Sequence, residues 1–287
     1  MFQNLTNQQK GSLLAFVGVI FITPDSLFIR LANADTYQLL FYRGAIPFVA
    51  VFLALLIIYK SNFVRLFLNT GYAGIAYSLT FALTNITFII SIQNTNVANT
   101  LIMVALAPMF TAILSLIFLK ENPEKKTWVA IIITTLAAIY IFYDSIQIGN
   151  FLGDIFGLIT AIGLAAGAVI VRSAKNRNLV PSAVVGKLMV AVVAAFFVQN
   201  YELVNKDLII VPAMCILCVA IPFVMVTIAP RFISAAEVNL FFLIEVILGP
   251  IWVWLVIKEQ PSFETIIGGL VIIFTIAIHS ILVIKKT

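Results

Sequence analysis

The chain is built almost entirely from apolar runs of about 20 residues, separated by short polar connections. A helix needs about 20 consecutive apolar residues to cross the hydrocarbon core of a bilayer. We identify ten such runs: 11–31, 36–59, 71–91, 95–119, 127–143, 152–171, 181–198, 208–229, 234–257 and 263–284. Because a helix satisfies its own backbone hydrogen bonds in lipid, the sequence predicts an all-α polytopic membrane protein of ten transmembrane helices.

Composition excludes a water-soluble domain. Hydrophobic residues make up 62% of the chain and charged residues 10%, whereas soluble domains average about 45–50% and 25%. The formal net charge of +5 comes from basic residues in the connections between apolar runs. This dispersed charge does not form a nucleic-acid-binding patch, so we expect the lipid bilayer as partner and no nucleic acid.

Basic residues are distributed unevenly between alternate connections. If the N-terminus is cytoplasmic, twelve of the 17 Lys and Arg residues fall on the cytoplasmic side, and only Arg30, Lys206 and Lys258 fall on the other. Cytoplasmic loops of membrane proteins carry an excess of Lys and Arg. We therefore predict that both termini are cytoplasmic, and the short loops favour a bacterial inner membrane.

The two halves of the chain are similar to one another. Residues 11–30 align without gaps on residues 153–172, and residues 98–123 align on residues 236–261. Matched pairs include Gly11 with Gly153, Arg30 with Arg172, Arg43 with Lys187, and Lys120-Glu121 with Lys258-Glu259. Five spans in each half force opposite orientations, as in the inverted repeats of secondary transporters. The predicted domains are two inverted five-helix repeats, 1–145 and 150–287.

The ninth run contains an acid near its middle, Glu245. An acid at the bilayer centre costs roughly 2.5–3.5 kcal/mol, and such residues usually mark functional sites. Gly249-Pro250 follow at a point where the helix can kink. We predict that Glu245 binds a cationic group of a substrate or a proton; the alternative is a structural hydrogen bond. Glu237 is predicted near the cytoplasmic mouth of the same cavity, or alternatively as an interfacial carboxylate favoured by the helix dipole.

Three further charged residues lie inside apolar runs. Asp25 follows the helix-breaking Pro24, where it suits a gate or substrate contact, with interfacial snorkelling as the alternative. Arg43 lies about 10 Å into the second run, and either pairs with Asp25 or Asp35 or holds a substrate carboxylate. Lys187, closer to the cytoplasmic end, is predicted to snorkel to the membrane surface.

Polar and aromatic side chains complete the candidate binding site. The predicted contributors are Tyr42, Asn85, Asn99 and Trp252, with Tyr77 and Phe88 as further aromatic walls. Aromatic faces attract cations, while amides inside spans bind either a ligand or a neighbouring helix. Gly163 and Gly167 form a G-x-x-x-G pattern, which predicts close contact between two helices.

Sequence motifs for other chemistries are missing. The sequence contains neither a P-loop nor the G-x-S-x-G or H-E-x-x-H pattern. Its single histidine cannot form a histidine metal cluster, and we interpret Cys215 and Cys218 as ordinary buried thiols. We therefore expect no cofactor, no metal and no enzymatic activity. The alternatives to a transporter are a lipid scramblase or flippase-like protein and an intramembrane enzyme.

Two segments in matching positions carry a family resemblance. They are residues 107–121 (APMFTAILSLIFLKE) and 229–238 (APRFISAAEV), the latter followed by Gly249-Pro250 and Lys258-Glu259. They resemble the half-repeats of the drug/metabolite transporter superfamily, EamA-type branch, and the resemblance extends over essentially the whole chain. It implies a ten-span carrier of small metabolites, working by exchange with a counter-substrate or by coupling to a proton or another ion.

The charged residues suggest what such a carrier would move. Acids at Glu245, Glu237 and Asp25, with a base at Arg43, would suit a small amphoteric or cationic molecule. We predict a secondary active transporter of a small metabolite, such as an amino acid or an amine, that works by alternating access.

Overall fold

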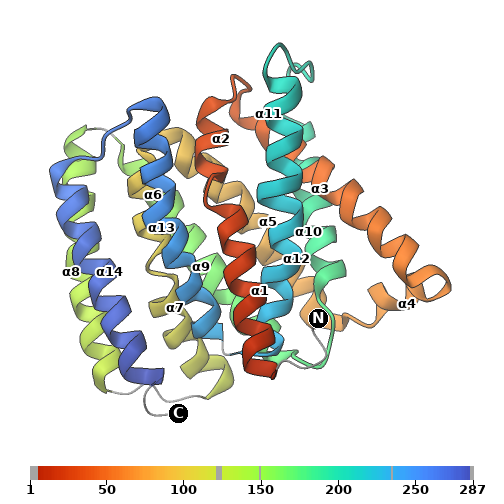
Figure 1. The fold of residues 1–287 in the computed structure, drawn as a ribbon, viewed down its shortest axis with the longest axis horizontal. Coiled ribbons are helices and arrows are strands. Elements are labelled where there is room, and N and C mark those ends of the chain that lie inside the picture. Colours follow the sequence, from red (N-terminus) through yellow and green to blue (C-terminus); the bar gives the residue numbers. More distant parts are fainter. Residues whose placement is uncertain (1–5, 121–124, 149, 234, 285–287) are drawn as a thin grey trace.

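A computed structural model of the protein describes residues 6–120, 125–148, 150–233 and 235–284. Within these ranges the regular elements are all helices, which run mostly side by side in one bundle (Figure 1). This arrangement confirms the all-helical class that the apolar runs predict.

The first half of the chain contains eight α-helices in the described residues. They are α1 (Asn7–Ile22), α2 (Asp25–Leu31), α3 (Thr36–Tyr59), α4 (Phe63–Leu68), α5 (Gly71–Asn94), α6 (Val97–Val104), α7 (Ala107–Leu114) and α8 (Lys125–Ile148). Thr6 and Gln9 form a capping box at the start of α1. Pro24 occupies the N-cap of α2, and because proline has no backbone N–H it interrupts the first apolar run there.

The second half contains six more α-helices in its described part. They are α9 (Phe151–Ser173), α10 (Val180–Ala195), α11 (Asp207–Met214), α12 (Ile221–Ile228), α13 (Ala235–Ile257) and α14 (Phe263–Ile284). A π-helical turn, Cys215–Ala220, joins α11 to α12. Pro212 and Pro222 lie on either side of this turn and cannot donate backbone N–H groups to a regular α-helical ladder.

Length and hydropathy divide the helical segments into two groups. Six segments of the described chain are long and apolar enough to span a membrane: Asn7–Leu31, Thr36–Leu68, Gly71–Asn94, Val97–Leu119, Phe151–Ser173 and Asp207–Arg231. The shorter apolar helices are Trp128–Ile141, Val180–Ala195, Ile244–Ile257 and Phe263–Thr275. The protein is therefore a multi-pass helical membrane protein, and each of the ten predicted runs contains helix.

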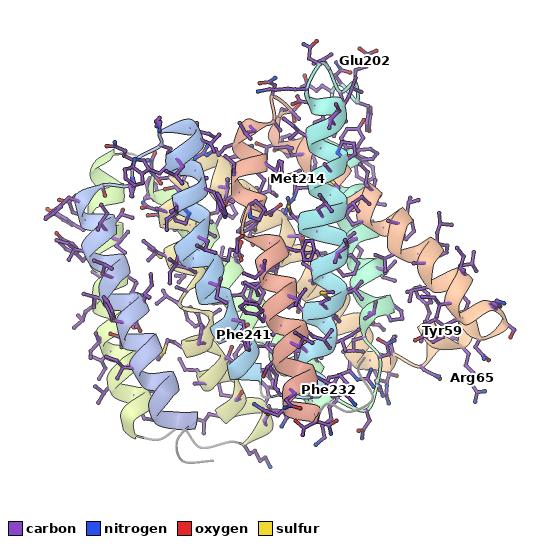
Figure 2. The ribbon with its side chains drawn as sticks, in the orientation of Figure 1. Tyr59, Arg65, Glu202, Met214, Phe232 and Phe241 are labelled. Carbon is purple, nitrogen blue, oxygen red and sulfur yellow. The ribbon has the colours of Figure 1, made fainter. Side chains whose placement is uncertain are left out.

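The bundle has two distinct ends. We call the end where α1 starts and α14 finishes the terminal end, and the opposite one the distal end (Figure 1). Phe232 lies at the terminal end and Glu202 at the distal end (Figure 2). At the terminal end, Arg177 Nη1 donates a hydrogen bond to the backbone carbonyl of Thr70 at 3.1 Å, which ties the connections before α5 and α10 together.

Helices from the two halves pack against one another throughout the bundle. α3 packs on α10, α5 on α9, α8 on α14 and α1 on α12, while α13 contacts α1, α6, α7 and α9. The contact predicted from G-x-x-x-G is confirmed, because Gly163 and Gly167 of α9 lie against Thr84 and Tyr77 of α5. Such small residues let helix backbones approach closely.

The closest backbone approach in this interface gives a first prediction. A Cβ atom on Gly44 of α3 would lie 2.5 Å from Ala191 N and 2.8 Å from Lys187 O of α10. Gly44→Leu is expected to force these helices apart and lower the free energy of unfolding by at least about 1–3 kcal/mol. Thermal unfolding in detergent measures the effect, with Ala54→Leu on the exposed face of α3 as the control. Equal midpoints for the two variants would contradict this prediction.

Candidate functional site

The break between α1 and α2 lies opposite the second turn of α3. Arg43 Nη1 and Nη2 donate to Asp25 Oδ1 and Oδ2 at 2.5 and 2.8 Å. The two residues are 5% and 2% exposed, so Asp25 does not snorkel to the membrane surface. Bidentate arginine–carboxylate pairs are among the strongest hydrogen-bonded contacts in proteins. The other predicted partner of Arg43, Asp35, instead caps α3 by accepting the backbone N–H groups of Tyr37 and Gln38.

A second base, Lys187 of α10, lies buried inside the bundle. It is 1% exposed, and its Nζ donates to Asn85 Oδ1 of α5 at 2.5 Å. The same nitrogen lies 5.5 and 6.0 Å from the ring centroids of Phe81 and Phe223. The snorkelling prediction for Lys187 is therefore wrong, because the side chain turns inward to these neighbours. Within the described residues, no carboxylate lies at ion-pair distance from Lys187.

The acid predicted at mid-membrane, Glu245, is also buried. It is 3% exposed in the middle of α13, and the Asp25–Arg43 pair is close enough to interact with it electrostatically. Among the residues that the structure describes, none forms a hydrogen bond or an ion pair with the Glu245 carboxylate. The alternative reading, a structural hydrogen bond to a neighbouring helix, gains no support from these contacts.

These charged side chains line one cavity in the bundle. Its walls come from both halves, chiefly from α5, α9, α12 and α13, while α3 and α10 contribute Arg43 and Lys187. About 150 Å³ is open to the centres of water molecules. A cavity needs only about 10–15 Å³ of such space to hold one water, so this one can hold several waters or a small metabolite. Phe81, Phe88, Phe223 and Phe242 contribute to walls that are mostly apolar.

Half of the predicted site residues meet in this cavity. Those that line it are Asp25, Arg43, Asn85 and Glu245, and the predicted aromatic walls Tyr77 and Phe88 line it as well. Glu237 lies on α13, but its side chain is outside the part that the structure describes.

The remaining three predicted site residues are not among the cavity-lining residues. The Tyr42 hydroxyl donates to the backbone carbonyl of Tyr201 near the distal end. Asn99 Oδ1 accepts a hydrogen bond of 2.5 Å from Thr265 of α14. Trp252 is 41% exposed, and its indole N–H lies 3.4 Å from Thr23 Oγ1.

Lys187 and Asn239 are among the polar cavity residues that sequence reasoning missed. The match between Arg43 and Lys187 in the repeat alignment was a usable signal, since a buried base in one half suggests one in the other. Asn239 Nδ2 donates to Thr111 Oγ1 at 2.6 Å, and no sequence signal distinguishes it from other polar residues in the spans.

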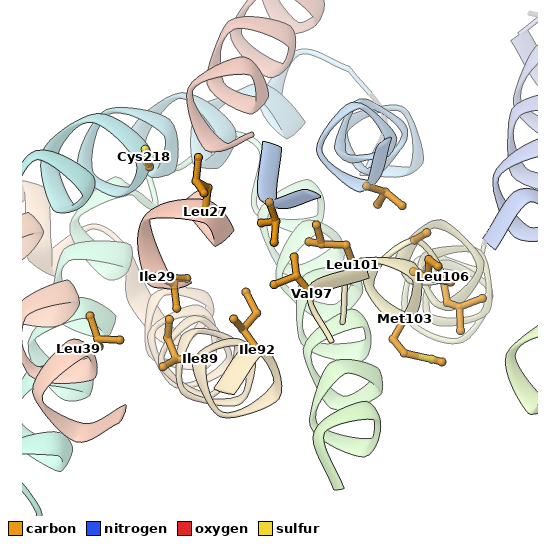
Figure 3. Close-up of a cluster of buried hydrophobic side chains, with 14 of the residues drawn as sticks. Leu27, Ile29, Leu39, Ile89, Ile92, Val97, Leu101, Met103, Leu106 and Cys218 are labelled. Atoms are coloured by element: carbon orange, nitrogen blue, oxygen red, sulfur yellow. The ribbon is translucent and has the colours of Figure 1, made fainter. Parts of the chain in front are cut away.

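A cluster of buried apolar side chains, several of which are drawn in Figure 3, lies on the distal side of the cavity residues. Its members include Ile29, Leu39, Ile89 and Ile92, none of which is more than 1% exposed. They lie one to two turns beyond the polar cavity residues on the same helices, α2, α3 and α5. This apolar cluster therefore lies between the cavity residues and the distal ends of these helices.

A polar network covers the same end of the bundle. Arg30 Nη2 donates to Thr95 O at 2.7 Å, and Arg30 Nε lies 3.1 Å from Glu259 Oε2. Glu259 Oε1 accepts the backbone N–H of Val97 at 2.8 Å. We call Arg30, Glu259 and these two backbone groups the distal latch. It ties α2 and the start of α6, in the first half, to the connection between α13 and α14 in the second.

Comparison with known proteins identifies the family. The family model described as "EamA-like transporter family" matches residues 9–143 and, a second time, residues 151–281. The chain belongs to the EamA-like transporter family. The resemblance that the sequence shows is thereby confirmed, and the two matches give this EamA-like protein a two-repeat layout. Its family makes it a multi-pass membrane transporter of the drug/metabolite superfamily with a small-molecule substrate.

Solved structures support the fold of this EamA-like chain. One titled "Crystal structure of protein" has a TM-score of 0.69 and 14% sequence identity, and the match covers 95% of this chain and 97% of that one. At this identity the likeness shows the fold alone. No curated protein matches the chain.

Proposed function

We propose that this EamA-like protein is a secondary active transporter that moves a small metabolite by alternating access. The observation that carries the proposal is the cavity between the halves, where Asp25, Arg43, Lys187 and Glu245 converge. Ionisable residues inside a membrane are expensive and usually face substrate pathways. Secondary transporters built from repeats bind their substrates near the midplane between those repeats.

Helix packing supports inverted repeats that cover residues 1–145 and 150–287. α3 and α10 occupy matching positions in the two halves, as do α8 and α14, and each pair packs together. The contact of α1 with α12 has its counterpart in the contact of α9 with α5. A two-fold axis in the membrane plane would produce this set of pairings.

Matched arginines at the two ends support alternating access. In the distal latch, Arg30 bonds Thr95 O at 2.7 Å. Its repeat counterpart Arg172 lies at the terminal end, where Nη1 is 3.5 Å from Ile233 O. Ile233 matches Thr95 when the repeat alignment is continued by three residues. The distal contact is thus the shorter of the two. In the proposed cycle, each of these contacts forms while the other one breaks. The excess of basic residues supports a cytoplasmic terminal end, in a bacterial inner membrane.

Weakening the distal latch is expected to shift the protein toward the state open at the distal end. Val226 lines the cavity near the terminal end, so Val226→Cys reports on access from that side once Cys215 and Cys218 are replaced by alanine. Arg30→Gln removes charge-assisted bonds worth about 1.5–3 kcal/mol and should slow labelling of this cysteine by a small thiol reagent several-fold. Glu202→Cys, exposed in a distal loop, should label equally with and without Arg30→Gln. Unchanged labelling at position 226 would contradict the latch.

Counterflow in proteoliposomes tests the transport function directly. Vesicles loaded with one unlabelled amino acid, amine or nucleotide sugar should accumulate the labelled form of the same compound, with saturable kinetics. Lipid scrambling without any solute counterflow would favour the scramblase alternative. Chemical conversion of a solute would instead favour an intramembrane enzyme.

A further inference from the structure

The four charges of the cavity differ in how they are compensated. Asp25 and Arg43 neutralise one another through two hydrogen bonds. For Lys187 and Glu245, the described part of the chain supplies no ion-pair partner. The cavity therefore contains one positive and one negative group whose charges a ligand can satisfy, and a net charge near zero.

These two groups lie on different walls of the cavity. α10, which carries Lys187, packs on α3 and α5, whereas α13, which carries Glu245, packs on α1, α6, α7 and α9. α10 and α13 are not among the helix pairs that pack extensively on one another. A ligand that binds both groups must therefore reach from one wall of the cavity to the other, which requires an elongated molecule.

The surroundings of Lys187 form a built site for an anionic group. An ammonium has three N–H donors, and Asn85 Oδ1 accepts one of them at 2.5 Å. The side chain is 1% exposed and still lines the cavity, so a cavity ligand can supply further acceptors. A buried charge without a partner is costly, which favours a ligand that brings the opposite charge.

We infer that the substrate is an elongated amphoteric molecule whose carboxylate binds Lys187 and whose ammonium group binds Glu245. This inference rests on the proposed transport function and names its substrate class. A simple amine would leave Lys187 without a counter-ion, and a simple carboxylic acid would leave Glu245 without one. A monovalent carboxylate matches the single ammonium, while the apolar walls, including Phe81 and Phe223, suit a hydrocarbon spacer between the charged ends.

A chain-length series tests the spacing of the two charges. Glycine, β-alanine, γ-aminobutyrate, δ-aminovalerate and ε-aminocaproate are compared by thermal stabilisation of the purified full chain and by counterflow. Amylamine and valerate match δ-aminovalerate in length, and hexylamine and caproate match ε-aminocaproate. We expect the best ω-amino acid to bind at least about tenfold more tightly than glycine and than its matched amine or acid. This comparison uses the unaltered protein and does not depend on how any variant folds.

The variant Lys187→Met then tests whether Lys187 binds the carboxylate of the substrate. The variant should bind the best ω-amino acid and its matched alkylamine equally, while Lys187→Arg should keep part of the preference for the amino acid. An alkylamine that binds the unaltered protein as tightly as the ω-amino acid would overturn the inference, as would a preference that survives Lys187→Met in full. Failure of the entire series would also overturn it, and counterflow of another metabolite would then leave the proposed transport function standing.

Discussion

Replacing Arg43 with methionine is expected to lower the free energy of unfolding by about 3–5 kcal/mol, because it leaves a buried carboxylate without its partner. The variant loses both hydrogen bonds to Asp25, at 2.5 and 2.8 Å. It also leaves Asp25 and Glu245 as two acids in the cavity without the guanidinium that interacts with both. The midpoint of thermal unfolding in detergent measures the effect.

A double variant separates the charge effect of Arg43→Met from simple loss of packing. Asp25→Leu combined with Arg43→Met removes both charges and should recover part of the lost stability, since apolar residues often replace buried ion pairs at little cost. Arg65→Met, at an exposed position, is the control and should leave the midpoint unchanged. A single Arg43→Met variant as stable as the unaltered protein would show that the pair contributes little.

Much of the fold can be predicted from the sequence because the bilayer constrains each apolar run separately. A run of about 20 residues has to be helical in lipid, and Pro24 shows where the first run breaks. Breaks inside other runs are harder to locate. α6 and α7 separate at Ala105-Leu106, with Pro108 two residues later, and Pro212 and Pro222 flank the π-helical turn Cys215–Ala220 without indicating its position or its π-helical form.

The candidate site was partly predictable for the same reason. Asp25 and Arg43 carry opposite charges at similar distances from the distal end, and each needs a partner in the membrane. Lys187 was placed wrongly because depth along a helix gives the distance to the surface but not the direction of the side chain. That direction depends on α3 and α5, against which α10 packs. Tyr42 was expected in the cavity on residue type, and Trp252 because it shares a broad helix face with Glu245, but neither argument determines which side chains reach the cavity.

Glu245→Gln is expected to abolish most transport while leaving stability unchanged or raised. In the described structure no residue pairs with the Glu245 carboxylate, so neutralising it removes a desolvation cost without breaking an ion pair. Transport should fall at least about tenfold, because the hydrogen bond from a cationic group to a carboxylate is worth at least that factor. Counterflow in proteoliposomes and thermal unfolding in detergent are measured on the same preparation.

The opposite signs expected for the two cavity variants distinguish a functional acid from a structural one. If Glu245 were structural, Glu245→Gln would lower the unfolding midpoint, as Arg43→Met does, and transport would fall only in proportion to the folded fraction. A midpoint that is kept or raised together with lost counterflow means that the carboxylate is retained at the expense of stability because transport needs it. Glu245→Asp keeps the charge and should retain part of the counterflow. The exposed Glu202→Gln removes an acid outside the cavity and should change neither measurement.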